Sequence, residues 1–181
     1  MNNRLQSAWL KLEQQRHDII RLIGKLPEEL FLKQPPDRSW SVAEVLTHLI
    51  TVEHLSLGYM KKKALDWNKA QTAGPGSQIR LGMFILSQRL PLKFKAPAVV
   101  VQNTPPTVPL KNTLERWQAV RDEMKEFLAA IPDEHIHKEI YKHPQAGRFT
   151  ARQALVVFRE HAKHHLPQIK RLLKSFSSPA H

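Results

Sequence analysis

The chain of 181 residues contains no cysteine. This absence excludes disulfide bonds, a cysteine nucleophile and zinc sites ligated by cysteine. A metal site in this protein must therefore use nitrogen and oxygen ligands. If its chemistry involves a thiol, that thiol has to arrive with a substrate.

Long apolar runs are also missing from the sequence. A membrane-spanning helix needs about 20 consecutive apolar residues, and no stretch comes near that length. Residues 1–4 do not begin the apolar segment of a secretion signal. We therefore expect a cytoplasmic protein that does not associate with membranes. Its length suits one domain, which we place at residues 1–176, followed by a flexible tail at 177–181.

Acidic residues are scarce, with 16 Asp and Glu against 28 Lys and Arg, and the formal net charge is +12. Such a balance favours anionic partners but does not identify one. The basic residues are dispersed, residues 61–63 are the only run of three lysines, and no stacking aromatics alternate with them. We expect no specific binding of nucleic acid.

Helical periodicity dominates the rest of the chain. Apolar residues recur every three or four positions over four segments, which we predict to be long helices at residues 5–23, 41–65, 112–131 and 150–176. A shorter helix is predicted over residues 79–90, and the proline-rich residues 91–109 then form a long irregular connection between the second and third long helices. The predicted fold class is all-α.

Capping signals mark the start of three of these helices. Ser41 and Glu44 have the spacing of a capping box, and so do Asn112 and Glu115 and, before the last helix, Thr150 and Gln153. A capping box satisfies backbone N–H groups that the first helical turn leaves without partners. These pairs therefore predict where the second, third and fourth long helices begin.

Three histidines are the candidate functional residues. His48 lies beside the apolar stripe of the second long helix, and His161 and His165 lie one turn apart on the same face of the last. If the two helices pack together, the three imidazoles converge on one divalent metal ion with coordination positions left open. The alternative is that they are ordinary core or surface histidines.

Other polar residues near these positions have two interpretations each. Glu44 either caps its helix or accepts a hydrogen bond from His48, and we favour the cap. Gln168 either positions a substrate or water, or is a surface amide, which we favour. We expect His164 to face away from the pair and to be exposed. His135, His137 and His143 are interpreted as solvated loop histidines.

The chain resembles the DinB-like superfamily, which includes metal-dependent bacillithiol transferases and mycothiol-dependent isomerases. The matching residues are Trp40, Ser41, Glu44, His48 and Leu49; then His143, Pro144, Gly147, Phe149 and Thr150; then the run from His161 to Ile169. The resemblance implies a four-helix bundle of up-down-down-up connection. It also implies that His48, His161 and His165 ligate a divalent ion, nickel or zinc first, with manganese and iron as alternatives. Pro167 replaces the small residue common in the family and predicts a kink.

Two classes of function remain open at this point. The first is a metal-dependent enzyme, a thiol S-transferase or a hydrolase, whose three-histidine site acts on a small-molecule substrate such as a low-molecular-weight thiol. The second is a non-catalytic binding protein that contains a metal or binds its partner through its basic surface. Such a protein could act as a homodimer formed through an exposed helix face. No motif in the sequence separates the two classes.

Overall fold

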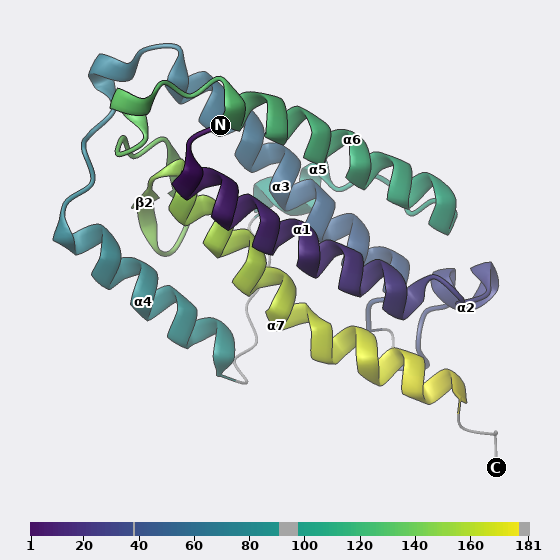
Figure 1. The fold of residues 1–181 in the computed structure, drawn as a ribbon. Helices are drawn as coiled ribbons and strands as arrows, with labels where there is room; N and C mark the ends of the chain where they lie inside the picture. Colours follow the sequence, from purple (N-terminus) through teal and green to yellow (C-terminus); the bar gives the residue numbers. More distant parts are fainter. Residues whose placement is uncertain (38, 91–97, 178–181) are drawn as a thin grey trace.

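A computed structural model describes residues 1–37, 39–90 and 98–177 of the chain. Helices account for most of these residues (Figure 1), which confirms the predicted all-α class. The elements in chain order are α1 (Asn3–Ile23), α2 (Glu28–Leu32), α3 (Val42–Ala64), the 3-10 turn η1 (Trp67–Lys69), α4 (Pro75–Arg89), α5 (Ala98–Asn103), α6 (Leu110–Ala129), the 3-10 turn η2 (Asp133–His135), β1 (Tyr141–His143), β2 (Gly147–Phe149) and α7 (Ala151–Ser177).

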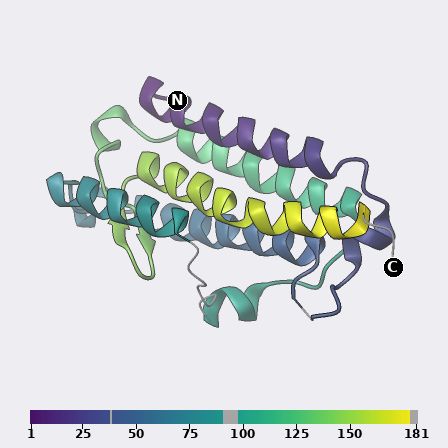
Figure 2. The same cartoon turned by 90° about the horizontal axis from the view of Figure 1, so that it is seen from below.

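The long helices α1, α3, α6 and α7 lie side by side and form the body of the molecule (Figures 1 and 2). α1 packs against α7, and α3 packs against both α6 and α7. α1 and α7 run away from the end that carries the two short strands, and α3 and α6 run toward it (Figure 1). α4 lies at the edge of this layer against α7. α3 and α7, the helices that carry the candidate histidines, are therefore in contact.

α3 begins where its capping box predicts. The hydroxyl oxygen of Ser41 accepts a hydrogen bond from the Glu44 backbone N–H at 3.1 Å, and the Glu44 carboxylate accepts one from the Ser41 N–H at 2.7 Å. The helix then buries a dense apolar face, which includes Val45, Leu46 and Leu49. The reciprocal cap fixes the first turn, and with it the register that brings His48 into the interior.

α7 begins with the predicted pair as well. The Thr150 hydroxyl accepts from the Gln153 N–H at 3.2 Å, and the Gln153 side-chain oxygen accepts from the Thr150 N–H at 2.9 Å. The helix continues through Pro167 as one element and reaches Ser177. Ser177, which we assigned to the tail, is thus helical, and residues 178–181 of the predicted tail lie outside the described residues.

The connection between α3 and α6 is more structured than predicted. α4 begins at Pro75, four residues before the predicted helix, because a proline is well suited to the first helical position, where no N–H is needed. Residues 98–103, predicted to be irregular, form α5. Residues 91–97 of the proline-rich stretch lie outside the described residues. The short helix α2 was not predicted. The Asn112 capping box was wrong, because α6 begins at Leu110 with Pro109 as its N-cap and without a side-chain cap.

The segment before α7 is also corrected. Residues 141–149 form a two-stranded antiparallel hairpin in which Tyr141 pairs with Phe149 and His143 with Gly147. Gly147 has φ +86°, a left-handed conformation that favours glycine and closes the turn. Three residues per strand are too few to show a period in the sequence. The hairpin packs on α3, α4 and α7, so it contacts both helices that carry the candidate histidines.

A buried ionic cluster joins α1, α3 and α6. The Arg121 guanidinium makes two hydrogen bonds of 2.7 Å to the Glu53 carboxylate and one of 2.7 Å to Glu13. The indole N–H of Trp117 donates to the same Glu53 carboxylate at 3.0 Å. Because Arg121 and Glu53 are buried, their charges depend on each other rather than on water. In the described part of the chain, no helix is both long and apolar enough to span a membrane.

Candidate metal centre

The structure brings the three histidines proposed from the sequence together. α3 presents His48 and α7 presents His161 and His165 at the contact between these two helices. His48 is 6% exposed, and the other two are partly buried. Their four-residue spacing places His161 and His165 on one face of α7, as predicted.

In all three imidazoles, the Nε2 atom points toward a common centre. The Nε2 atom of His161 lies 3.3 Å from Nε2 of His48 and 3.2 Å from Nε2 of His165. One nitrogen from each residue lies within 4.8 Å of the other two. The rings meet edge to face, with centroids 4.9 to 5.2 Å apart, so they do not stack on one another.

The hydrogen bond made by the second ring nitrogen of His165, Nδ1, determines the tautomer of this residue. Nδ1 of His165 lies 3.1 Å from the side-chain oxygen of Gln168. A carboxamide oxygen only accepts hydrogen bonds, so Nδ1 carries the proton and Nε2 keeps a free lone pair directed at the other histidines. Gln168 is therefore the residue that orients this ring. The sequence signal for it was its position three residues after His165, and the favoured interpretation as a surface amide was wrong.

Burial keeps these histidines neutral. Together with the neighbouring His165, it lowers the pKa of His48 to about 4, and burial is the larger cause. It also holds the pKa of His161 well below its usual value, again with help from His165 and His48. The pKa of His165 is lowered by burial too, although its bond to Gln168 opposes this. Neutral imidazole is the form that ligates a metal.

The arrangement fits a divalent metal ion. Ligand nitrogens at about 2.0 to 2.1 Å from a tetrahedral zinc lie about 3.3 to 3.4 Å from one another, close to the two separations that run through His161. Lone pairs brought this close repel each other unless a cation or a shared proton lies between them. Within residues 1–37, 39–90 and 98–177, the cluster with metal-site geometry consists of His48, His161 and His165 and contains no carboxylate.

Trp40 forms a wall of the site. Its ring is nearly parallel to that of His165, at an interplanar angle of 15° and a centroid distance of 6.2 Å, and its centroid lies 5.0 Å from that of His48. Trp40 is 36% exposed, so one part of its ring contacts the histidines and another part faces solvent. Sequence analysis noted Trp40 only as part of the family pattern and did not place it at the site.

Two further histidines differ from their predictions. His164 is partly buried, with Nδ1 3.0 Å from the backbone oxygen of Gln88 on α4, rather than exposed. Nδ1 of His143 accepts hydrogen bonds from the backbone N–H groups of Gln145 and Ala146 at 3.2 and 3.1 Å. Burial lowers the pKa of His143 to about 4, so it is not a solvated loop residue.

The remaining candidates fall outside the cluster. Both carboxylate oxygens of Glu44 are engaged, one in the cap and the other by the Gln34 amide at 2.9 Å, which agrees with the favoured capping interpretation. His137 is exposed, as predicted, while His135 is partly buried with its ring stacked on Trp67. Neither residue belongs to the cluster of three.

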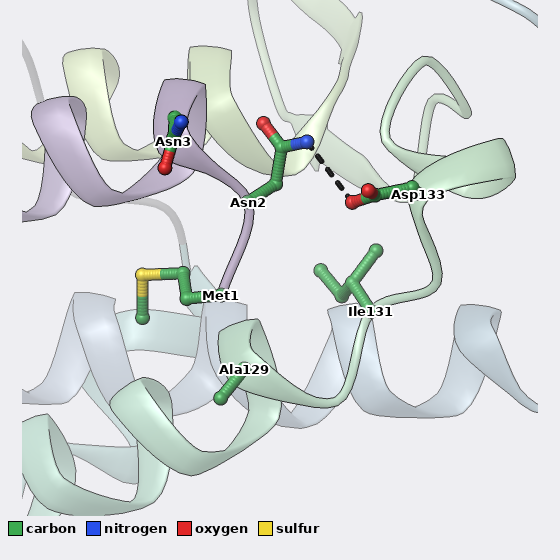
Figure 3. A pocket seen from close by; sticks show the side chains of 6 residues that line it. All are labelled: Met1, Asn2, Asn3, Ala129, Ile131 and Asp133. Atoms are coloured by element: carbon green, nitrogen blue, oxygen red, sulfur yellow. Dashed lines mark hydrogen bonds between the residues drawn. The ribbon is translucent and has the colours of Figure 1, made fainter.

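A separate hollow of about 340 Å³ lies at the start of α1 and the end of α6 (Figure 3). Its lining includes Asn2, whose amide donates to the Asp133 carboxylate at 2.9 Å, and Ile131. None of the three histidines lines it. It is therefore not the mouth of the histidine site.

Comparison with known protein families identifies the superfamily to which the chain belongs. No curated protein matches its sequence. The sequence profile of the DinB superfamily, a group of metal-binding proteins, matches residues 11–169, a span that contains all three histidines, Trp40 and Gln168. By this match over most of its length, the chain belongs to the DinB superfamily.

Proposed function

We propose that this protein is a metal-dependent enzyme in which His48, His161 and His165 hold a divalent ion and a small-molecule thiol is the substrate. The observation that carries the proposal is the convergence of three neutral Nε2 atoms, two pairs of them 3.2 and 3.3 Å apart. Three protein ligands with an open position are typical of catalytic rather than structural metal sites. We also infer that the four long helices form the up-down-down-up bundle that the family resemblance implies.

Nickel and zinc suit the donor set best. All three donors are imidazole nitrogens, which suit zinc and nickel, whereas manganese prefers oxygen ligands. Iron remains compatible with imidazole but is commonly held with a carboxylate, which the described cluster lacks. The expected order is therefore nickel or zinc before iron and manganese.

A bound divalent ion would act as a Lewis acid that lowers the pKa of a thiol or of water at its open position. Other residues of the chain then orient the ligands and contact the substrate. Gln168 fixes the ring of His165, and the partly exposed Trp40 offers an aromatic face to the organic part of a substrate. Because the chain has no cysteine, the reacting sulfur belongs to the substrate.

The absence of a carboxylate from the described cluster favours thiol transfer over hydrolysis. A free thiol has a pKa of about 8.5, much closer to neutral than that of water, so it needs less help to lose its proton. In the transfer, the sulfur forms a bond to the electrophilic carbon while the bond from that carbon to its leaving group breaks. The thiol proton passes to solvent. Hydrolysis of a small ester by the same site is the related alternative.

A non-catalytic role is the second candidate. The same lack of a carboxylate base beside the histidines favours it, because many metal-dependent hydrolases pair the metal with such a base. In that case the site would bind a metal, or the basic surface an anion, without turnover. The alternative predicts metal binding with no reaction.

The experiment that separates these functions is a metal-dependent activity assay. Protein stripped of metal is reconstituted with nickel or zinc and mixed with low-molecular-weight thiols and an alkylating electrophile such as monochlorobimane. We expect a rate above the metal-free blank, lost in His48→Ala and kept in the exposed-site control His137→Ala. Metal-loaded protein that gives only the blank rate, with several thiols and with esters, would favour the non-catalytic role.

A further inference from the structure

α4 carries a second apolar face that stays exposed in the described part of the chain. Leu81 and Phe84 on its inner side are buried against the body of the protein. On the outer side Ile79 is 63% exposed, Met83 59% and Leu86 62%, and Leu90 at the end of the helix is 46% exposed. The inner face therefore packs α4 against the body of the protein, while the outer residues remain largely exposed.

The outer residues have the spacing that is typical of two helices packed against each other. Ile79, Met83, Leu86 and Leu90 follow one another at intervals of four, three and four, which is the repeat of a helix that packs against another helix. Gly82 lies among them, and the space where its Cβ would stand is open. A glycine at this point would let an opposing helix approach closely.

Charge does not oppose a contact at this face, although the chain carries a net charge of +12. The only charged residues of α4 are Arg80 and Arg89. Arg80 is bound to the Glu139 carboxylate at 2.8 Å, and Arg89 lies 3.5 Å from the buried Glu160 carboxylate. Both cations are therefore paired within the chain, and two copies can approach through α4 with less repulsion than through a lysine-rich face.

The exposed area points to a second copy of the chain. Each of the four side chains exposes on the order of 100 Å² of apolar surface, so the stripe offers about 400 Å², as much as the largest patch on a typical monomer. A symmetric pair uses the stripe twice and buries about 800 Å² from these side chains alone. With the flanking contacts, this approaches the roughly 1,200 Å² at the lower end of specific interfaces.

We propose that the outer face of α4, formed by Ile79, Gly82, Met83, Leu86 and Leu90, is the interface of a reversible homodimer. Figures 1 and 2 show α4 at the edge of the helix layer, where a second copy can reach it. The dimer does not depend on the metal site, because none of the three histidines lies on α4. Its failure in a test would therefore leave the proposed enzymatic function unaffected.

Sedimentation equilibrium over a wide range of protein concentrations tests the interface. We expect a concentration-dependent dimer whose dissociation constant rises at least about tenfold in Leu86→Glu, since the pair would place two carboxylates in an apolar contact. The matched control is Leu10→Glu, because Leu10 is 58% exposed on α1, outside the stripe, and should leave the dimer intact. Equal circular dichroism and thermal midpoints verify that both variants fold.

Cross-linking gives a second measurement that does not depend on weakening the contact. The chain has no cysteine, so Met83→Cys introduces a single thiol near the centre of the stripe. We expect it to form a disulfide-linked dimer under mild oxidation much faster than Leu10→Cys. A wild-type protein that stays monomeric at every concentration, or a dimer that Leu86→Glu leaves unchanged, would overturn the proposal.

Discussion

The side-chain oxygen of Gln168 lies 3.1 Å from Nδ1 of His165 and fixes which nitrogen of that ring faces His48 and His161. The contact spans less than one turn of α7, from position 165 to position 168. Losing a partner of this type typically lowers the affinity of a metal site by about 10- to 100-fold. Gln168 thus connects the local geometry of one helix to the proposed chemistry between two helices.

Replacing Gln168 should weaken metal binding without unfolding the protein. In Gln168→Leu the His165 ring loses its acceptor, and we expect the affinity for zinc to fall by about 10- to 100-fold. Gln168→Glu keeps an acceptor at the same position and serves as the control. Competition against a chromophoric chelator measures both variants, and equal affinity in Gln168→Leu and wild type would show that Gln168 does not position the ligand.

Trp40 should report the occupancy of the site. Its ring centroid lies 5.0 Å from that of His48, whereas Trp9 and Trp117 lie beside the buried Arg121. The fourth tryptophan, Trp67, stacks on His135, which is not part of the cluster. We expect nickel to quench tryptophan fluorescence in the wild type and to have little effect in Trp40→Phe. If Trp40→Phe retained the full quenching, the metal would have to bind away from the three histidines.

The stability of the metal-free protein should decrease in mild acid. Burial lowers the pKa of His48 to about 4, while the unfolded chain has its histidine pKa near 6.5. Between these values the unfolded state binds a proton that the folded state does not, so the stability present above about pH 6.5 is lost progressively as the pH falls toward 4. At pH 5 the loss from His48 alone is about 2 kcal/mol.

Urea unfolding at pH 7.5 and pH 5 checks this pH dependence. The variant His48→Gln carries no titratable group at this position and should lose about 2 kcal/mol less than the wild type between the two pH values. His137→Gln, at an exposed position, is the control and should behave as the wild type does. The same loss in His48→Gln and wild type would show that His48 is not held neutral by burial.

The buried ionic cluster should matter for stability and not for the metal. Arg121→Met leaves the buried Glu53 carboxylate without its counterion, and we expect the free energy of unfolding to fall by about 3 to 5 kcal/mol. Adding Glu53→Leu removes that unpaired charge and should restore much of the loss. Metal content per folded molecule should stay the same in both variants.

A double variant no more stable than Arg121→Met would contradict the charge explanation. The loss would then come from the packing of the Arg121 side chain between Trp9 and Trp117, which both variants remove. A loss of metal in folded Arg121→Met would instead show that the cluster and the histidine site are coupled.

The long helices and the histidine pair were predictable because their signals are local. The Ser41 and Glu44 pair acts within one turn, and so does the spacing of His161 and His165. The meeting of His48 with this pair joins residues more than 100 positions apart. From the sequence, only the family resemblance predicted that contact.

Other features escaped prediction for physical reasons. The short helix was predicted to begin at residue 79, yet α4 begins at Pro75, because proline is well suited to the first helical position. The hairpin at residues 141–149 is too short to show an alternating pattern, so His143 was assigned to a solvated loop. Trp40 reaches the site from outside the helix that follows it, and no spacing rule places such a side chain.

Metal content, measured by plasma mass spectrometry after dialysis against metal-free buffer, tests the central claim most directly. Both short separations in the cluster include Nε2 of His161, so His161→Ala removes the atom that joins the other two. We predict near-stoichiometric nickel or zinc in the wild type and in the control His137→Ala, and almost none in folded His161→Ala. Equal metal in wild type and His161→Ala, or no metal in wild type even after reconstitution, would contradict the three-histidine centre.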